Sequence, residues 1–370
     1  MKEKIRFIGL DVHKEFISVA VADEGRSDVE SRGEVSNTPS SVKKLAEKLS
    51  RDGHDLCFVY EAGCFGFVLY RHLTQLGHSC VVAAPSLIPR KPGDRIKTDT
   101  RDALKLARLL RSGDLTPCQV PDDSDEAMRD LVRAREDAVC AYRVSRQRLN
   151  GFLLRHGKVY GGKSAWTKMH MNWILDINMP HEAQQIVMEE YRLRVTHDAA
   201  CVDTLTDQIR RLNQSWRWVS VVNALQALRG VSLITAVTMI AEMGDLRRFS
   251  HPRQLMAAIG LVPSEYSSGG KRHQGAITKT GNGHVRKMLV ESGWNYRYPA
   301  RLTRHIERRQ RGLSKGVIDI AWHAQKRLCG RYQQLSMRGK NVKLITTAVA
   351  RELCGFIWDI AQQIEPNTNR

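Results

Sequence analysis

Four acidic residues have the side chains and the spacing that a metal-dependent nuclease requires. Asp11 and Glu61 each follow an apolar run that predicts a buried strand. Asp99 and Asp102 lie three residues apart, so on a helix they share one face. Carboxylates at two strand ends and on one helix face can converge, and hard divalent cations such as Mg²⁺ or Mn²⁺ prefer oxygen ligands. The pattern therefore predicts a divalent metal site built from these four side chains.

The charge of the chain suggests what such a site would act on. The formal net charge is +19 over 370 residues, which indicates a polyanionic partner, most simply DNA or RNA. Two metal ions held about 4 Å apart can stabilise both the attacking and the leaving oxygen of a phosphodiester. The two observations together predict chemistry on nucleic acid. The alternative is a soluble protein that is merely basic.

Each acid also has a purely structural interpretation. Asp99 is a suitable helix N-cap, and Asp102 would lie in the first turn, where the helix dipole favours a negative charge. Asp11 could be a solvated strand end. Only the joint pattern favours catalysis, because all four acids fall where predicted elements begin or end.

A second segment with chemical potential runs from residue 263 to residue 287. Hydroxyl, glycine and cationic residues alternate in it between two predicted helices. Glycine lets backbone amides approach a phosphate closely. The cations that would neutralise that phosphate are Lys271, Arg272, Lys279 and Arg286. Ser267 and Ser268 either attack a phosphodiester or only donate hydrogen bonds, and composition alone favours the second role.

The elements that must position the acids are predicted to form an α/β domain over residues 1–117. The expected order is three strands within 5–35, a helix over 40–49, a strand over 55–61, a helix over 65–76, a strand over 79–84 and a helix from 99 to 110. This is the order of a ribonuclease-H-like domain.

Residues 118–224 are predicted to form a linking arm of two long helices. The first runs from 122 to about 156. The second carries apolar residues at alternating steps of three and four, namely Val202, Leu205, Ile209, Leu212, Trp216 and Val219. The seam is typical of an antiparallel coiled coil or a dimer interface. Two core-facing helices of a bundle would show the same pattern.

Residues 225–370 are predicted to be mostly helical. Ser232 can cap a helix over 233–243, and the free amides there would bind an anion, as in a helix-hairpin-helix phosphate grip. An ordinary helical hairpin is equally compatible with the motif. Over residues 301–343, Lys and Arg far outnumber the acids. This segment, with Arg308 and Arg309, predicts a face that binds the backbone of DNA or RNA, against the alternative of a solvated helical surface.

The cysteines and the apolar segments predict the compartment. No two of the eight cysteines have Cys-x-x-Cys spacing, so we expect a reducing cytoplasm and no structural zinc. No segment approaches the roughly 20 apolar residues of a membrane span. The charged N-terminus leads straight into a strand, so no signal peptide is expected.

Several segments together resemble a known family over nearly the whole chain. They are IGLDVHK (8–14), EA (61–62), KTDTRDA (97–103), GLVPSEYSSGGK (260–271) and ITKTGN (277–282). The chain resembles the DEDD transposases of bacterial insertion sequences, the family numbered one hundred and ten with its eleven-eleven subgroup. The resemblance implies a RuvC-like, metal-binding N-terminal domain, a coiled coil, and a C-terminal transposase domain with a serine nucleophile.

The resemblance also assigns roles to residues of this sequence. The four metal-binding acids map to Asp11, Glu61, Asp99 and Asp102, and the nucleophile maps best to Ser268, with Ser267 beside it. It implies a composite active site shared by two subunits of a dimer or tetramer. It further implies element DNA and target DNA as substrates, an element-encoded guide RNA, and a location in the bacterial cytoplasm, at the nucleoid when bound to DNA.

Two other functions are weighed against this one. The first is a RuvC-like nuclease that cuts DNA with water, in which the serine loop only binds. The second is a non-enzymatic nucleic-acid-binding protein, and the intact acid quartet argues against it.

Overall fold

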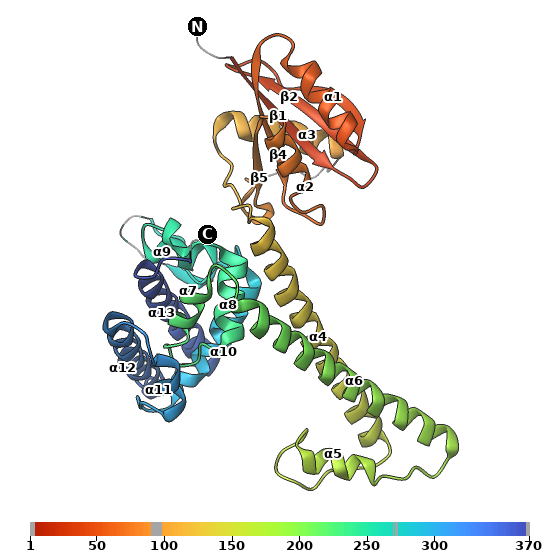
Figure 1. The fold of residues 1–370 in the computed structure, drawn as a ribbon, viewed down its shortest axis with the longest axis vertical. Coiled ribbons are helices and arrows are strands. Elements are labelled where there is room, and N and C mark those ends of the chain that lie inside the picture. The colour runs from red at the N-terminus through yellow and green to blue at the C-terminus, as the bar shows by residue number, and fades with distance from the viewer. Residues whose placement is uncertain (1–3, 90–97, 269, 271–272, 368–370) are drawn as a thin grey trace. The chain divides into compact units, whose positions relative to one another are not determined.

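The computed structural model describes residues 4–89, 98–268, 270 and 273–367. Two compact units make up the chain (Figure 1). The first contains Met1–Pro121 and Ala257–Gly283, and the second contains Asp122–Met256 and His284–Arg370. The division into three domains that the sequence suggests stays a prediction.

A five-stranded mixed sheet forms the core of the first unit, in the order β3-β2-β1-β4-β5. The strands are β1 (Lys4–Val12), β2 (Phe16–Asp23), β3 (Glu30–Ser36), β4 (His54–Glu61) and β5 (Ser79–Ala83). β2 pairs antiparallel with β1 and β3, whereas β4 pairs parallel with β1 and β5. The predicted mixed α/β class is confirmed.

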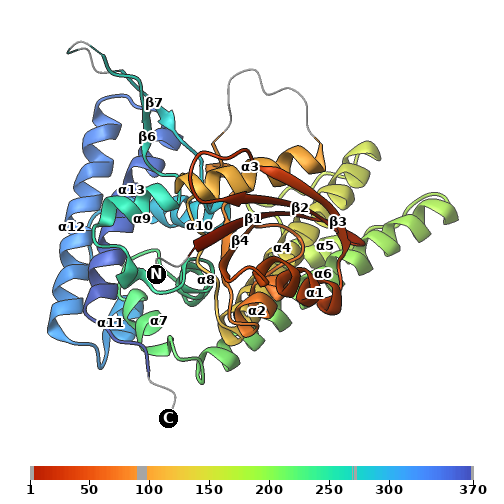
Figure 2. The ribbon, with the colours of Figure 1, turned by 90° about the horizontal axis from the view of Figure 1, so that it is seen from above.

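Helices cover both faces of this sheet (Figure 2). Ile8 and Leu10 of β1 are buried with apolar residues of α1 (Pro39–Ser50) and α2 (Val68–Gln75). Side chains alternate along a strand, so Gly9, which lies between Ile8 and Leu10, faces the other side of the sheet. That side is covered by α3 (Asp99–Ser112).

Gly9 sets how closely α3 approaches β1. A Cβ atom at Gly9 would lie 2.2 Å from the carbonyl oxygen of Ala103 and 2.5 Å from the amide nitrogen of Ala107. Both atoms belong to the backbone of α3 and cannot rotate away. The absence of a side chain at Gly9, with alanines opposite, therefore allows the helix to pack directly on the strand that carries Asp11.

We expect Gly9→Ala to lower the free energy of unfolding by about 2–3 kcal/mol, because the added methyl group displaces α3 from the sheet. Urea denaturation measures the change. Gly63→Ala is the matched control in the same unit, since its nearest neighbouring atom, the Glu61 carbonyl oxygen, is 3.9 Å away. Equal stability of the two variants would show that α3 does not need this close contact.

Two long helices dominate the second unit. α4 (Asp123–Arg155) and α6 (Glu182–Asn213) run side by side in opposite directions, and α5 (Lys168–Leu175) lies in the connection between them (Figure 1). Both long helices were expected from the sequence. Whether they also join two subunits stays a prediction.

The apolar seam predicted for the second long helix is wrong at its end. α6 stops at Asn213, so Trp216 lies beyond the helix, and Leu212 is 38 % exposed. Hydrogen bonds from two tryptophans explain why the helix ends there. The indole Nε1 atoms of Trp216 and Trp218 donate to the carboxylate of Asp125, at 2.8 and 3.0 Å, and Asp125 is 4 % exposed. These bonds to the first turn of α4 hold the chain in a turn.

The rest of the described chain is mostly helical, as expected. The helices are α7 (Val219–Leu225), α8 (Leu233–Met243), α9 (Pro252–Ala258), α10 (Gly283–Gly293), α11 (Arg304–Gln310), α12 (Lys315–Met337) and α13 (Val342–Gln362). Short 3-10 helices cover Pro85–Leu87, Leu246–Arg248 and Trp294–Arg297. Among the helices of the described residues, none has both the length and the hydrophobicity that a membrane crossing needs.

Candidate active site

Asp11 and Glu61 lie at the same edge of the sheet. Leu10 of β1 pairs with Tyr60 of β4, and the two strands are parallel, so the two acids follow at matching positions. Asp11 lies two residues after Gly9 and therefore leaves the sheet on the face that α3 covers. Glu61 leaves β4 on the same face and is exposed.

Asp99 and Asp102 lie in the first turn of α3. The interpretation of Asp99 as the helix N-cap is wrong. Thr98 has the extended backbone of an N-cap, and its side chain accepts a hydrogen bond from the Arg101 amide at 3.3 Å. The carboxylate of Asp99 is therefore not used as the cap.

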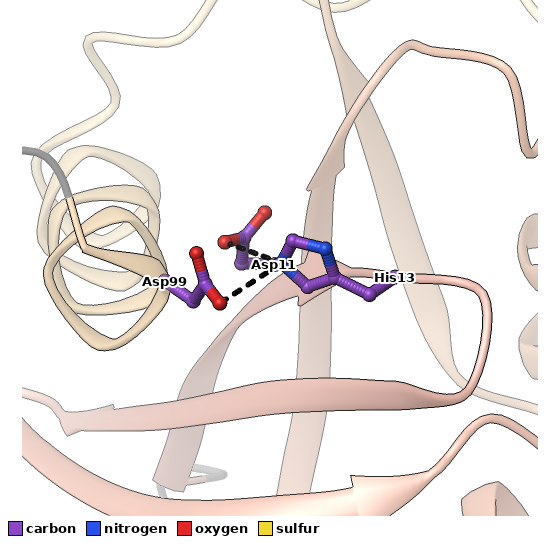
Figure 3. A group of neighbouring side chains, drawn as sticks. All are labelled: Asp11, His13 and Asp99. Carbon is purple, nitrogen blue, oxygen red and sulfur yellow. Dashed lines mark hydrogen bonds and ion pairs between the residues drawn. The ribbon is translucent and has the colours of Figure 1, made fainter.

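The structure brings Asp11 and Asp99 together around His13 (Figure 3). The Nε2 atom of His13 lies 3.2 Å from Oδ2 of Asp11 and 3.4 Å from Oδ2 of Asp99. One ligand atom from each residue lies within 4.8 Å of the others. The His13 ring is stacked on Phe16, with 4.7 Å between the ring centroids, and this contact fixes its orientation.

Sequence reasoning missed His13. The only signal was its position two residues after Asp11 in the segment IGLDVHK, and a single histidine after a strand is a weak signal. Its partner Asp99 is far away in sequence. Only the packing of α3 on the sheet brings the imidazole and the two carboxylates together.

The electrostatics of this group favour a bound cation. Burial raises the pKa of Asp11, and the negative charges of Asp102 and Asp99 raise it further, while the hydrogen bond and charge of His13 oppose the rise. Asp102 is thus close enough to act on the charge of Asp11. Oxygen ligands with excess negative charge fit a hard divalent cation, so Asp11, Asp99 and His13 could hold a metal ion. Glu61 and Asp102 lie outside the 4.8 Å group.

We expect Mg²⁺ to raise the melting temperature of the wild type more than that of Asp11→Asn. The pKa of Asp11 is raised in the folded state, so ionised Asp11 costs folding free energy, and the stability of the metal-free chain falls as pH rises through that pKa. Asparagine removes this cost, and a bound cation offsets it. Without metal, the variant should therefore melt at least as high as the wild type.

Scanning calorimetry at neutral pH, with Mg²⁺ or with a chelator, measures both effects. Asp114→Asn is the control, because Asp114 is an exposed acid beyond the end of α3. An equal Mg²⁺ response in the wild type and in Asp11→Asn would remove Asp11 from the ligand set.

The serine-rich segment forms a hairpin. β6 (Pro263–Glu265) pairs antiparallel with β7 (Gln274–Ile277), and Ser267 and Ser268 follow β6 as exposed residues. The Oγ atom of Ser267 donates to Oε1 of Glu265 at 2.8 Å. This places a carboxylate beside a candidate nucleophile, and sequence reasoning had given Glu265 no role.

The base of the hairpin is closely packed. Lys279 has a left-handed backbone with φ of 57°, and its amide donates to the Gly260 carbonyl at 3.2 Å. A Cβ at Gly281 would lie 2.0 Å from the Ala258 carbonyl oxygen, so this position requires glycine. Lys271 and Arg272, two of the expected phosphate ligands, lie outside the described residues.

The other expected cations lie on helices of the second unit. Arg286 belongs to α10 and is half-buried. Arg308 is exposed on α11. Its neighbour Arg309 is half-buried, and its guanidinium donates to the Val231 carbonyl at 3.0 Å. Arg309 thus holds the turn before α8 as well as carrying charge.

Comparison with known proteins gives two family matches. Residues 8–157 match a family of transposases that is named for DEDD and IS110, and residues 222–307 match the transposase IS116/IS110/IS902 family.

Similar proteins match over most of this chain. The putative transposase y4qE of Sinorhizobium fredii is 46 % identical over 364 residues, which cover 98 % of this chain and 90 % of the relative. The transposase for insertion sequence element IS1533 of Leptospira borgpetersenii is 30 % identical over 350 residues, 92 % of this chain and 99 % of the relative. The transposase for insertion sequence element IS1111A of Coxiella burnetii is 23 % identical over 337 residues, 86 % of each chain.

Proposed function

Because the chain belongs to the IS116/IS110/IS902 family of transposases, we propose that it excises and inserts an insertion-sequence element by cutting and rejoining DNA. The observation that carries the proposal is the meeting of Asp11 and Asp99 at the start of α3, on a strongly basic chain. The order of the five strands supports a ribonuclease-H-like, RuvC-like domain around them.

The metal ligands in this proposal are the four acids predicted from the sequence, Asp11, Glu61, Asp99 and Asp102. A bound Mg²⁺ or Mn²⁺ would neutralise the charge of the scissile phosphate and of the oxygens that attack and leave it. Asp11 and Asp99 supply oxygens within one small group, and Asp102 adds negative charge next to Asp11. His13 holds both carboxylates in place when no cation lies between them.

Ser268 is the proposed nucleophile. Its Oγ atom forms a bond to the scissile phosphorus, and the bond from phosphorus to one strand end breaks. The Ser268 proton passes to a neighbouring base or water, and the released strand end takes up a proton to become a free hydroxyl. When the hydroxyl of another strand attacks the phosphoserine, its oxygen forms a new bond to the phosphorus and the bond from phosphorus to Ser268 Oγ breaks. The serine oxygen takes up the proton that the attacking hydroxyl loses, so the DNA is sealed without added energy.

Ser267 is the alternative nucleophile. Its hydroxyl already donates to Glu265, a carboxylate that can accept the proton when the oxygen attacks. Ser268 is preferred because its position before a double glycine matches the family motif.

The proposed partners are nucleic acids and further copies of the chain. Two sets of cations would bind phosphates. Those of the serine-rich segment, which would neutralise the phosphate held there, are Lys271, Arg272, Lys279 and Arg286. Those of the basic helical face, which would bind the nucleic-acid backbone, are Arg308 and Arg309. An element-encoded RNA would read the sequence by base pairing, and two or four subunits would combine acids of one with the serine of another. The protein would then act in the bacterial cytoplasm, at the nucleoid when bound to DNA.

Rejoining of DNA distinguishes this proposal from the alternative function, a RuvC-like nuclease that cuts DNA with water. A plasmid carrying the element with its flanking non-coding DNA is incubated with the protein, the RNA transcribed from that DNA, and Mg²⁺, without ATP or ligase. We expect sealed circles of recombined DNA. Cut ends that are never resealed would favour the hydrolytic nuclease.

A further inference from the structure

A cavity of about 520 Å³ lies in the second unit, whereas the acids and the serines belong to the first unit. Its walls come from four segments, which are the end of α6, α7, the start of α8, and α11. A cavity of this volume is in the range of sites that hold a nucleotide-sized group. Nothing in the proposed cleavage chemistry uses it.

The charged side chains that line the cavity are all basic. Arg210 of α6 and Arg309 of α11 line it, together with His305, whereas none of the described residues that line it is acidic. Arg210 also pairs with Asp207 one turn earlier on α6, at the exposed surface. The lining therefore fits an anion.

The first turn of α8 adds backbone donors to this wall. Ser232 is the N-cap of α8, an 11-residue helix, and its side chain accepts from the Thr235 amide at 3.3 Å. Ser232, Leu233 and Ile234 line the cavity. The N-terminus of a helix carries a partial positive charge and amides without helical partners, and both favour a phosphate.

One buried side-chain oxygen in the cavity wall has no hydrogen-bond partner among the described residues. Asn213 lines the cavity and is 5 % exposed, and its Oδ1 atom has no hydrogen-bond partner in the described part of the chain. A buried polar atom left unpaired costs free energy. Rotation of the amide by 180° presents its N–H groups to an acceptor instead. Burial also lowers the pKa of Arg309, an effect that a nearby anion would offset.

We propose that this cavity binds a phosphodiester of the nucleic-acid backbone and so anchors the polynucleotide through residues other than the acids and the serines. Arg210 and Arg309 neutralise the phosphate, and the α8 amides and the Asn213 amide donate to its oxygens. The inference rests on the nucleic-acid substrate of the proposed function but not on its metal or its serine.

Fluorescence anisotropy with labelled duplex DNA and with labelled element RNA, both without divalent metal, tests the anchor. Arg210→Gln should weaken binding of at least one of them about 10-fold and reduce the salt slope by about one unit. Arg211→Gln is the matched control. Arg211 lies on the same turn of α6, is exposed and bonds to Gln208 three residues earlier, but it does not line the cavity. Its loss should change affinity less than twofold.

Asn223→Asp provides a second variant, in which the new side chain has the same size as the old one. Asn223 is exposed on α7 and lines the cavity, and aspartate keeps the oxygen that accepts from Gln226. The added negative charge should weaken binding at least as much as Arg210→Gln. A loss confined to DNA or to RNA identifies which backbone occupies the cavity.

Equal effects of Arg210→Gln and Arg211→Gln, or unchanged affinity in Asn223→Asp, would overturn the anchor. The proposed recombination chemistry would survive that result, because cleavage by the same variants at saturating DNA is measured separately.

Discussion

Replacing Asp102 by asparagine should abolish DNA cleavage, with a loss on the order of 10³-fold or more, because the acids act as one charged group. Asp102 lies in the first turn of α3 and contributes to the raised pKa of Asp11, so its charge is part of the field that a cation would meet. Asparagine has the same shape without the charge. Single-turnover cleavage of end-labelled DNA with Mg²⁺ measures the loss.

The fold should survive this substitution, since Asp102 is half-buried and isosteric with asparagine. Circular dichroism and the melting temperature in the absence of metal check this. Asp114→Asn, an equal loss of charge at an exposed site of the same unit, should cleave at the wild-type rate. Wild-type cleavage by Asp102→Asn would remove Asp102 from the site.

The second large effect is the loss of a covalent protein–DNA adduct in Ser268→Ala. The wild type should form an adduct that survives denaturing electrophoresis, because the phosphoserine bond is covalent. Ser268 is exposed beyond β6, so its substitution leaves no buried group unpaired. Without the hydroxyl there is no bond to form, and rejoining should be lost together with the adduct.

Ser267→Ala is the matched control for this experiment. It removes an adjacent exposed hydroxyl and its bond to Glu265, and it should still form the adduct. If the adduct persists in Ser268→Ala and disappears in Ser267→Ala, the nucleophile is Ser267, with Glu265 as its base. If cleavage continues in both variants and no adduct is ever seen, water is the nucleophile.

The local elements of this fold could be predicted because their patterns are strong. The two strands that carry Asp11 and Glu61 are apolar runs, and parallel pairing puts their ends at one edge of the sheet. α3 begins at Asp99, as the sequence predicts, and ends at Ser112, two residues beyond the predicted end. The meeting of Asp11 and Asp99 follows from these elements once α3 packs on β1, and Gly9 permits that contact.

The features that were missed depend on single side chains and on distant partners. Trp216 continues the apolar spacing of α6, but its indole bonds to the buried Asp125, so the helix ends earlier than its pattern suggests. Thr98 caps α3 because its hydroxyl, rather than the Asp99 carboxylate, reaches the Arg101 amide. Such choices between neighbouring polar groups leave no periodic signal in a sequence.

The cavity at the start of α8 could not be predicted from the sequence for a further reason. Its lining joins segments near residues 210, 223, 232 and 309, which no spacing rule connects. The sequence indicated an anion site at Ser232 from capping alone. The packing of α6 and α11 around that helix start adds the cations and the buried amide of Asn213.

Two groups should act on the same phosphorus. One is the cation that the acids hold, and the other is the hydroxyl of Ser268. DNA in which sulfur replaces one non-bridging oxygen of the scissile phosphate tests this directly, because Mg²⁺ prefers oxygen and Mn²⁺ accepts the softer sulfur more readily. For one of the two diastereomers, the Ser268 adduct should be lost with Mg²⁺ and restored with Mn²⁺, and Asp102→Asn should show no rescue. Equal adduct from both diastereomers with Mg²⁺ would contradict the claim.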